Sequence, residues 1–138
     1  MSDYKDGVSD VLGVTALAPL LRATGTYTGT NLSLEDFNSA TFVLVVGAVT
    51  DGTFTWSLEE CNTSGGDWTA VADADINGTI GAQTVNTINQ VGYKGTKPWV
   101  RAKLVVAAGT TGGNTAAILV KGHPKYGPAG SSSTIRIS

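Results

Sequence analysis

The fold is decided by residues 41–59, TFVLVVGAVTDGTFTWSLE. Residues 42–46 form an unbroken run of aromatic, β-branched and aliphatic side chains, as expected for a strand covered on both faces. The dipeptide Asp51-Gly52 suits a type I′ hairpin turn, in which both central residues need positive φ. Residues 53–59 then alternate polar and apolar side chains, which is typical of a strand with one face toward the core. The stretch therefore predicts two strands joined by a hairpin, with Trp56 in the core.

A second pair of strands is predicted in the C-terminal half. In residues 99–106, four small or aliphatic side chains share one face, while Trp99, Arg101 and Lys103 share the other. Residues 109–114, GTTGGN, have the composition of a hairpin loop. The return strand follows, and its inward face is predicted to carry Ala116, Ile118 and Val120, with Lys121 outside.

Weaker patterns complete the chain. Residues 11–21 are apolar but interrupted by glycine and proline, so they predict an extended segment or an edge strand. Short strands are expected within 24–34, at 68–71 and at 85–93, a turn at 35–39 and one helical turn at 72–75. Six to eight short strands separated by turn signals predict an antiparallel β-sandwich, either jelly-roll or immunoglobulin-like, with a small β-barrel as the alternative. The expected organisation is an N-terminal arm (1–20), a sandwich domain (21–121) and a C-terminal tail (122–138).

Composition supports this fold class. The chain has 138 residues and a mass of 14.1 kDa, which corresponds to one domain that needs no disulfide or metal to fold. Charged residues make up only 14%, and 18 glycines disfavour a helical bundle. The N-terminus lacks the pattern of a signal peptide, and no apolar run is long enough to span a bilayer. The sequence thus predicts a soluble protein made in a cytoplasm.

Charge is distributed unevenly along the chain. Residues 1–75 contain all 11 acidic residues and two basic ones, a charge of −9, whereas residues 76–138 contain seven basic residues and no acid. One interpretation is that acidic and basic strands pair within one sheet. The other is that a negative face of one copy meets a positive face of another. The net charge of −2 argues against a nucleic-acid-binding protein under either interpretation.

No catalytic or metal-binding constellation is apparent. Residues 73–80, DADINGTI, match the first half of a calcium-binding loop, but Thr84 stands where the closing glutamate belongs. A local Asx-rich turn is the preferred interpretation. His123 and Cys61 lack a third partner that would orient or activate them, so both are expected to have packing or loop roles. Glu59 and Glu60 point to opposite faces of a strand. The sequence predicts a non-enzyme without metal or cofactor.

One surface patch is a candidate for protein contact. Trp99 shares its face with two basic side chains, and further lysines precede it. The patch consists of Lys94, Lys97, Trp99, Arg101 and Lys103. The alternative is that the arginine and lysine stems simply cover apolar surface.

Several segments resemble a known class of proteins. They are residues 49–54 (VTDGTF), 58–60 (LEE), 67–71 (DWTAV), 91–93 (VGY) and 121–124 (KGHP). With these segments, residues 40–128 resemble the small virion proteins that tailed bacteriophages and prophages encode near their major capsid protein, known as decoration, cement or minor capsid proteins.

The resemblance implies a non-enzymatic β-rich protein that binds the outside of a capsid shell, often as a trimer. The expected partners are the major capsid protein and other copies of the chain, without nucleic acid or membrane, and the expected location is the virion. The class has no catalytic residue to transfer. Two other functions remain open: a tail or head–tail connector protein, and a carbohydrate-binding module that uses exposed Trp or Tyr side chains.

Overall fold

The computed structural model describes residues 11–35, 37–63 and 65–124. Within them the chain is all-β, with one short 3₁₀ turn and no α-helix. The elements are β1 (Val11–Arg22), β2 (Gly25–Thr28), β3 (Leu32–Ser33), β4 (Phe37–Val49), β5 (Thr53–Cys61), β6 (Thr69–Ala70), η1 (Asp73–Asp75), β7 (Ile76–Asn77), β8 (Ala82–Gln83), β9 (Thr87–Tyr93), β10 (Trp99–Ala107) and β11 (Gly113–Pro124). In these residues no helix is long and apolar enough to cross a membrane.

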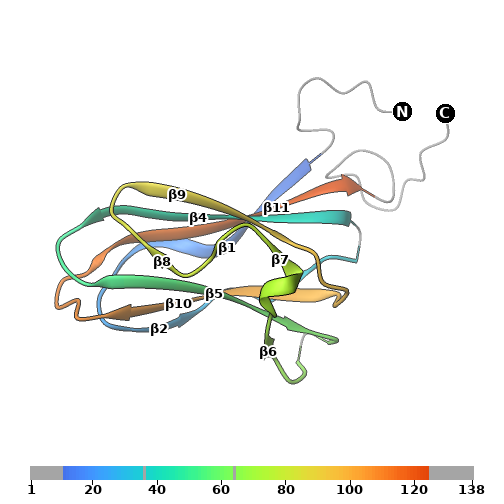
Figure 1. Cartoon of the computed structure of the whole chain (residues 1–138), viewed down its shortest axis with the longest axis horizontal. Helices are drawn as coiled ribbons and strands as arrows, with labels where there is room; N and C mark the ends of the chain where they lie inside the picture. Colours follow the sequence, from blue (N-terminus) through green and yellow to red (C-terminus); the bar gives the residue numbers. More distant parts are fainter. Residues whose placement is uncertain (1–10, 36, 64, 125–138) are drawn as a thin grey trace.

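The strands form two antiparallel sheets that pack face to face (Figure 1). Sheet A has the order β1-β11-β4-β9-β7, and sheet B has the order β2-β10-β5-β6, with β3 paired to β10 and β8 paired to β5. The pairs are nested along the chain: β1 pairs with β11, β2 with β10 and β4 with β9, which leaves β5 with β6 and β8 at the centre. A long hairpin folded over in this way is a jelly roll. The predicted β-sandwich is therefore confirmed, and of its two variants the jelly roll is present.

Both predicted hairpins are wrong, because each of their turns carries the chain from one sheet to the other. Asp51 and Gly52 link β4 in sheet A to β5 in sheet B, and of the two only Gly52 has positive φ (103°). Residues 108–112 link β10 in sheet B to β11 in sheet A. Turn residues favour a change of direction, but they do not specify whether the next strand pairs beside the last one or crosses to the opposite layer.

The boundaries of the sandwich also differ from those expected. Residues 11–20, expected in an arm, belong to β1 and pair with β11, with Val11 opposite Gly122. They form an edge strand, as the pattern of that segment predicted. Strand β11 continues to Pro124, opposite Phe37, so β4 begins inside the predicted turn at 35–39. The rest of the expected arm and tail, residues 1–10 and 125–138, lies outside the described residues.

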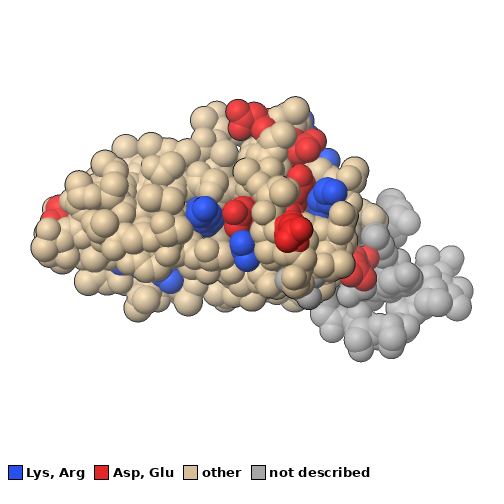
Figure 2. Space-filling view, turned by 90° about the horizontal axis from the view of Figure 1, so that it is seen from below, with Lys and Arg blue, Asp and Glu red and all other residues tan. Residues whose placement is uncertain are grey.

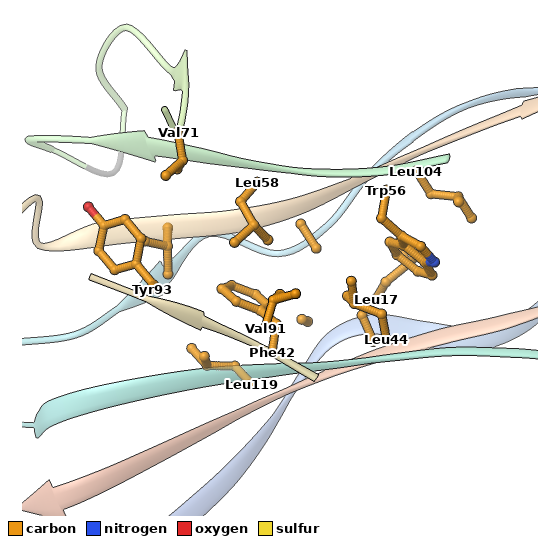
Figure 3. Close-up of a cluster of buried hydrophobic side chains, with 14 of the residues drawn as sticks. Leu17, Phe42, Leu44, Trp56, Leu58, Val71, Val91, Tyr93, Leu104 and Leu119 are labelled. Carbon is orange, nitrogen blue, oxygen red and sulfur yellow. The ribbon is translucent and has the colours of Figure 1, made fainter. Parts of the chain in front are cut away.

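The core lies between the two sheets (Figure 3). The inward side chains of β4, β5 and β10 are almost fully buried, and Trp56 is 2% exposed, as predicted. The inward face of β10 consists of the four residues expected, Val100, Ala102, Leu104 and Val106. Burial of these alternate side chains is the main driving force that holds the two layers together.

Arg22 is a charged residue buried beside the irregular half of β1. The register with β11 shifts twice between Thr15 and Leu20, which removes carbonyl groups of this segment from regular pairing. Arg22 is 6% exposed, and its Nη1 donates to the carbonyl oxygen of Ala18 at 2.8 Å and to that of Thr115 at 3.1 Å. Burial lowers the pKa of its guanidinium. The side chain thus supplies donors that the bulged backbone has lost.

Candidate protein-contact surfaces

The outer face of sheet B contains three of the five residues in the predicted patch. Trp99, Arg101 and Lys103 alternate along β10 with the buried residues, so they point away from the core and are half-buried. Figure 2 shows this face, on which acidic and basic side chains stand next to one another over one part of the sheet. The area has mixed charge rather than a uniformly basic character.

Arg101 is held by Glu59 of β5 and by Trp68, which directly precedes β6. Its Nε lies 2.7 Å from Glu59 Oε1, and the two residues are directly paired in the β10–β5 register. Its guanidinium carbon also lies 4.3 Å from the centre of the Trp68 ring, a cation–π distance. At this position an acid of the first half of the chain pairs with a base of the second half within one sheet, as the first interpretation of the charge distribution expects.

The other two lysines of the patch lie in the connection between β9 and β10. Lys94 is exposed, and its backbone N–H donates to the carbonyl oxygen of Asp75 at 2.7 Å. Lys97 is half-buried, and its backbone N–H donates to the hydroxyl of Tyr93 at 3.1 Å. Both lysines therefore lie at the end of the sandwich where β9 ends and β10 begins, just before Trp99 in the chain.

Tyr93, at the end of β9 in sheet A, forms a hydrogen bond to β5 in sheet B. Its hydroxyl donates to Glu60 Oε1 at 2.7 Å. The neighbouring Glu59 contacts Arg101 on the other side of the same strand. The two glutamates therefore point to opposite faces, as predicted. Burial, followed by the hydrogen bond to Glu60, raises the pKa of the Tyr93 hydroxyl well above its usual range. A hollow of about 460 Å³ lies beside it, with Phe37, Tyr93 and Lys97 among the residues that line it.

The outer face of sheet A has a different chemistry, and it was not among the surfaces predicted from the sequence. We call it the uncharged face, because its outward side chains on the four long strands carry no charge. It consists of Val11, Gly13, Thr15, Thr41, Val43, Val45, Ile88, Gln90, Ala116, Ile118 and Val120.

The predicted orientation of β11 was wrong. Ala116, Ile118 and Val120 were expected to face the core, so the uncharged face to which they belong was not predicted. Ala117 and Leu119 are the buried residues, whereas Ile118 is 42% exposed and points outward. Both alternate sets of this strand are apolar, so Lys121 alone suggested which set faced solvent. Lys121 instead extends from the inner side at the strand end, where its Nζ donates to the Ser33 carbonyl oxygen at 3.3 Å and lies 5.0 Å from the centre of the Phe37 ring.

The remaining candidates from the sequence are the calcium-loop-like segment 73–80, Cys61 and His123. One helical turn was expected at 72–75, and residues 73–75 form a 3₁₀ turn, closed by the Asp75 N–H and the Ala72 carbonyl oxygen at 2.9 Å. Among the described residues, no group of three or more His, Cys, Asp or Glu side chains could hold a metal ion. Cys61 is buried at the end of β5 with a free thiol, and His123 lies in β11.

Comparison with known proteins yields a distant structural similarity. No protein-family model matches the chain, and no characterised protein matches it in sequence. A chain in a solved structure of infectious bursal disease virus, Gx strain, matches with a TM-score of 0.47 and 17% sequence identity, over 86% of this chain and 34% of that chain. The chain thus spans about a third of the length of this viral chain, and the likeness is too coarse to identify a site.

Proposed function

We propose that this chain is a structural virion protein that binds the outer surface of a bacteriophage capsid and stabilises it. The observation that carries this proposal is the chemical difference between the two outer faces of a thin sandwich. One face is uncharged and largely apolar, while the other has charged and aromatic side chains at one end. A protein that adds to a repeating shell needs such flat surfaces for its neighbours, and the segment resemblance to decoration proteins agrees with this role.

The shell contact belongs, in this proposal, to the end of sheet B that holds Lys94, Lys97 and Trp99. Arg101 is already paired with Glu59, whereas neither Lys94 nor Lys97 forms an ion pair in the described part of the chain. An exposed or half-exposed ammonium group can accept an acidic partner with little rearrangement, and such contacts mainly set specificity and association rate. The partner surface is therefore expected to be acidic and to belong to the major capsid protein.

Binding to purified expanded shells of the phage or prophage that encodes the chain tests the proposal. We expect the full chain to sediment with the shells and to raise their melting temperature. The double variant Lys94→Glu with Lys97→Glu should bind more weakly, and binding of the wild-type chain should fall as salt rises. Thr26→Glu with Thr55→Glu, on exposed strand positions of the same sheet, is the control. Absence of binding to the shells, or absence of the chain from the particle, would refute the proposal.

A connector protein of the same virion is the main competing function. Copy number distinguishes the two, because a shell protein is present in hundreds of copies and a neck ring in roughly six or twelve, as closed cyclic symmetry dictates. Quantitative mass spectrometry of purified particles gives this number directly. A count of about six or twelve copies would indicate a connector protein in the neck instead of a protein on the shell.

A further inference from the structure

Several of the large hydrophobic side chains that are exposed to solvent lie on the uncharged face. Ile88 is 68% exposed, Ile118 is 42% exposed and Val11 is 37% exposed, and all three lie on this face. Leu20, 59% exposed, borders the same face, where it lines a groove of about 320 Å³ with Val45 and Ala116. By contrast, Val105 at 40% is the only large hydrophobic residue of comparable exposure on the outer face of sheet B among the described residues.

The apolar side chains of this face are contiguous across three strands. Register places Ile118 of β11 beside Val43 of β4, and Ala116 beside Val45. Val45 in turn lies beside Ile88 of β9. Val43 and Val45 belong to the run 42–46 that predicted a strand covered on both faces. The core covers only one of these faces, so the second remains open in a single copy.

We propose that the uncharged face is the contact between two copies of this chain, packed sheet on sheet. The inference is independent of shell binding and would hold wherever the chain functions. Four strands about 4.8 Å apart, over seven residues of about 3.3 Å each, give a projected area of about 450 Å². Side-chain relief and rim residues such as Leu20 add to it, and a standard stable interface buries about 800 Å² per partner. The face is thus of the right order for a dimer.

The absence of charge on this face favours a second copy over an unrelated partner. In a two-fold contact the same surface meets itself, so a charge near the two-fold axis would approach its own like charge. None of the eleven side chains of the uncharged face is charged, and none of them opposes this arrangement. Complementary charge is a common source of specificity for an unrelated partner, and this face does not provide it.

Contact through the faces is also favoured over contact through the free edge of sheet A. The edge strand β1 has two register shifts between Thr15 and Leu20, and Pro19 lies within this irregular segment. Bulges and proline both disrupt the regular row of donors and acceptors that another strand would need. The regular and β-branched part of sheet A is its outer face, which can pack against a like face about 10 Å away.

The experiment measures the mass of the full chain by sedimentation equilibrium over a range of micromolar concentrations. We expect the wild-type chain to be dimeric, with twice the chain mass of 14.1 kDa. Ile118→Asp and Ile88→Asp should each raise the dimer dissociation constant by roughly tenfold or more, because each introduces a charge that would be buried against its partner.

Val105→Asp is the matched control, since Val105 is 40% exposed on the outer face of sheet B and Ile118 is 42% exposed on sheet A. This variant should remain dimeric. Thermal unfolding of each variant in dilute solution shows whether the monomer is folded, and Ile88→Asp gives a second reading at a more exposed position. A wild-type monomer throughout the concentration range would overturn the inference. So would a dimer or trimer that is unaffected by both isoleucine substitutions.

Discussion

The Asp51 carboxylate accepts the backbone N–H of Gly112 at 2.7 Å, and thereby joins two of the connections that cross between the sheets, β4–β5 and β10–β11. The same carboxylate accepts the N–H groups of Thr111 at 3.1 Å and Thr110 at 3.2 Å. The backbone N–H of Thr50 donates to the Gly112 carbonyl oxygen at 2.9 Å. One acidic side chain therefore fixes the geometry of both crossings.

Replacement of Asp51 by Ala should destabilise the fold by about 2 kcal/mol. Three backbone N–H groups lose a charged acceptor, and hydrogen bonds to water replace only part of that loss. Asp51→Asn retains one acceptor oxygen and should lose about half as much. Urea unfolding followed by circular dichroism gives both values. Equal stability of Asp51→Ala and the wild-type chain would show that the two crossings are held by their backbone contacts alone.

Arg22→Met should lower the free energy of unfolding by about 2–3 kcal/mol. The substitution keeps the volume of the side chain but removes the donors to the Ala18 and Thr115 carbonyl oxygens. Lys103→Met, at a half-buried position on the outer face of sheet B, is the control and should change stability by less than about 0.5 kcal/mol. If both variants unfold at the same temperature, the bulge of β1 does not depend on Arg22.

The Arg101–Glu59 ion pair should contribute little by itself. The two side chains are 20% and 15% exposed, so a double-mutant cycle with Arg101→Ala and Glu59→Ala is expected to give a coupling energy of about 0.2–1 kcal/mol that decreases with salt. Arg101→Ala should cost more than Glu59→Ala, because it also removes the contact with the Trp68 ring. Equal costs of the two single variants would contradict a role for Trp68.

Tyr93 should give the protein an alkaline limit of stability. Its pKa is raised in the folded chain, mainly by burial and then by Glu60, so the folded state retains the hydroxyl proton more strongly than the unfolded state. The resulting stabilisation is complete below the unfolded pKa of about 10 and decreases as pH rises above it. Tyr93→Phe should show a weaker decline of melting temperature with pH than the wild-type chain. Parallel declines would mean that other groups set the limit.

The sequence patterns predicted which strands exist better than how they are arranged. Period-two alternation identified the inward face of β10 because Arg101 and Lys103 marked the other side. The same reasoning failed for β11, where Ala117 and Ile118 offer no contrast in polarity. Local turn chemistry at Asp51 and Gly52 is equally compatible with a hairpin and with a crossing between layers, so the choice depends on long-range pairing that no short window contains.

The candidate surfaces show the same limits. Trp99, Arg101 and Lys103 could be placed on one strand face from spacing alone. The partners that hold Arg101, Glu59 and Trp68, come from distant segments, and the spacing of β10 gives no sign of them. The clearest signal of the uncharged face was present in residues 42–46, as a run that is apolar on both sides. Its second side could be assigned to solvent only when the register with β9 and β11 was known.

The nested pairing has a consequence for how the molecule is made. Strand β1 pairs with β11, and Val11 lies opposite Gly122. Sheet A can therefore be completed only after β11 has been synthesised. Contacts of such long sequence separation slow folding, and they leave β4 without one neighbour during synthesis. The same pairing places residues 11 and 122 side by side, so a circularly permuted chain opened at another loop should retain every strand pair.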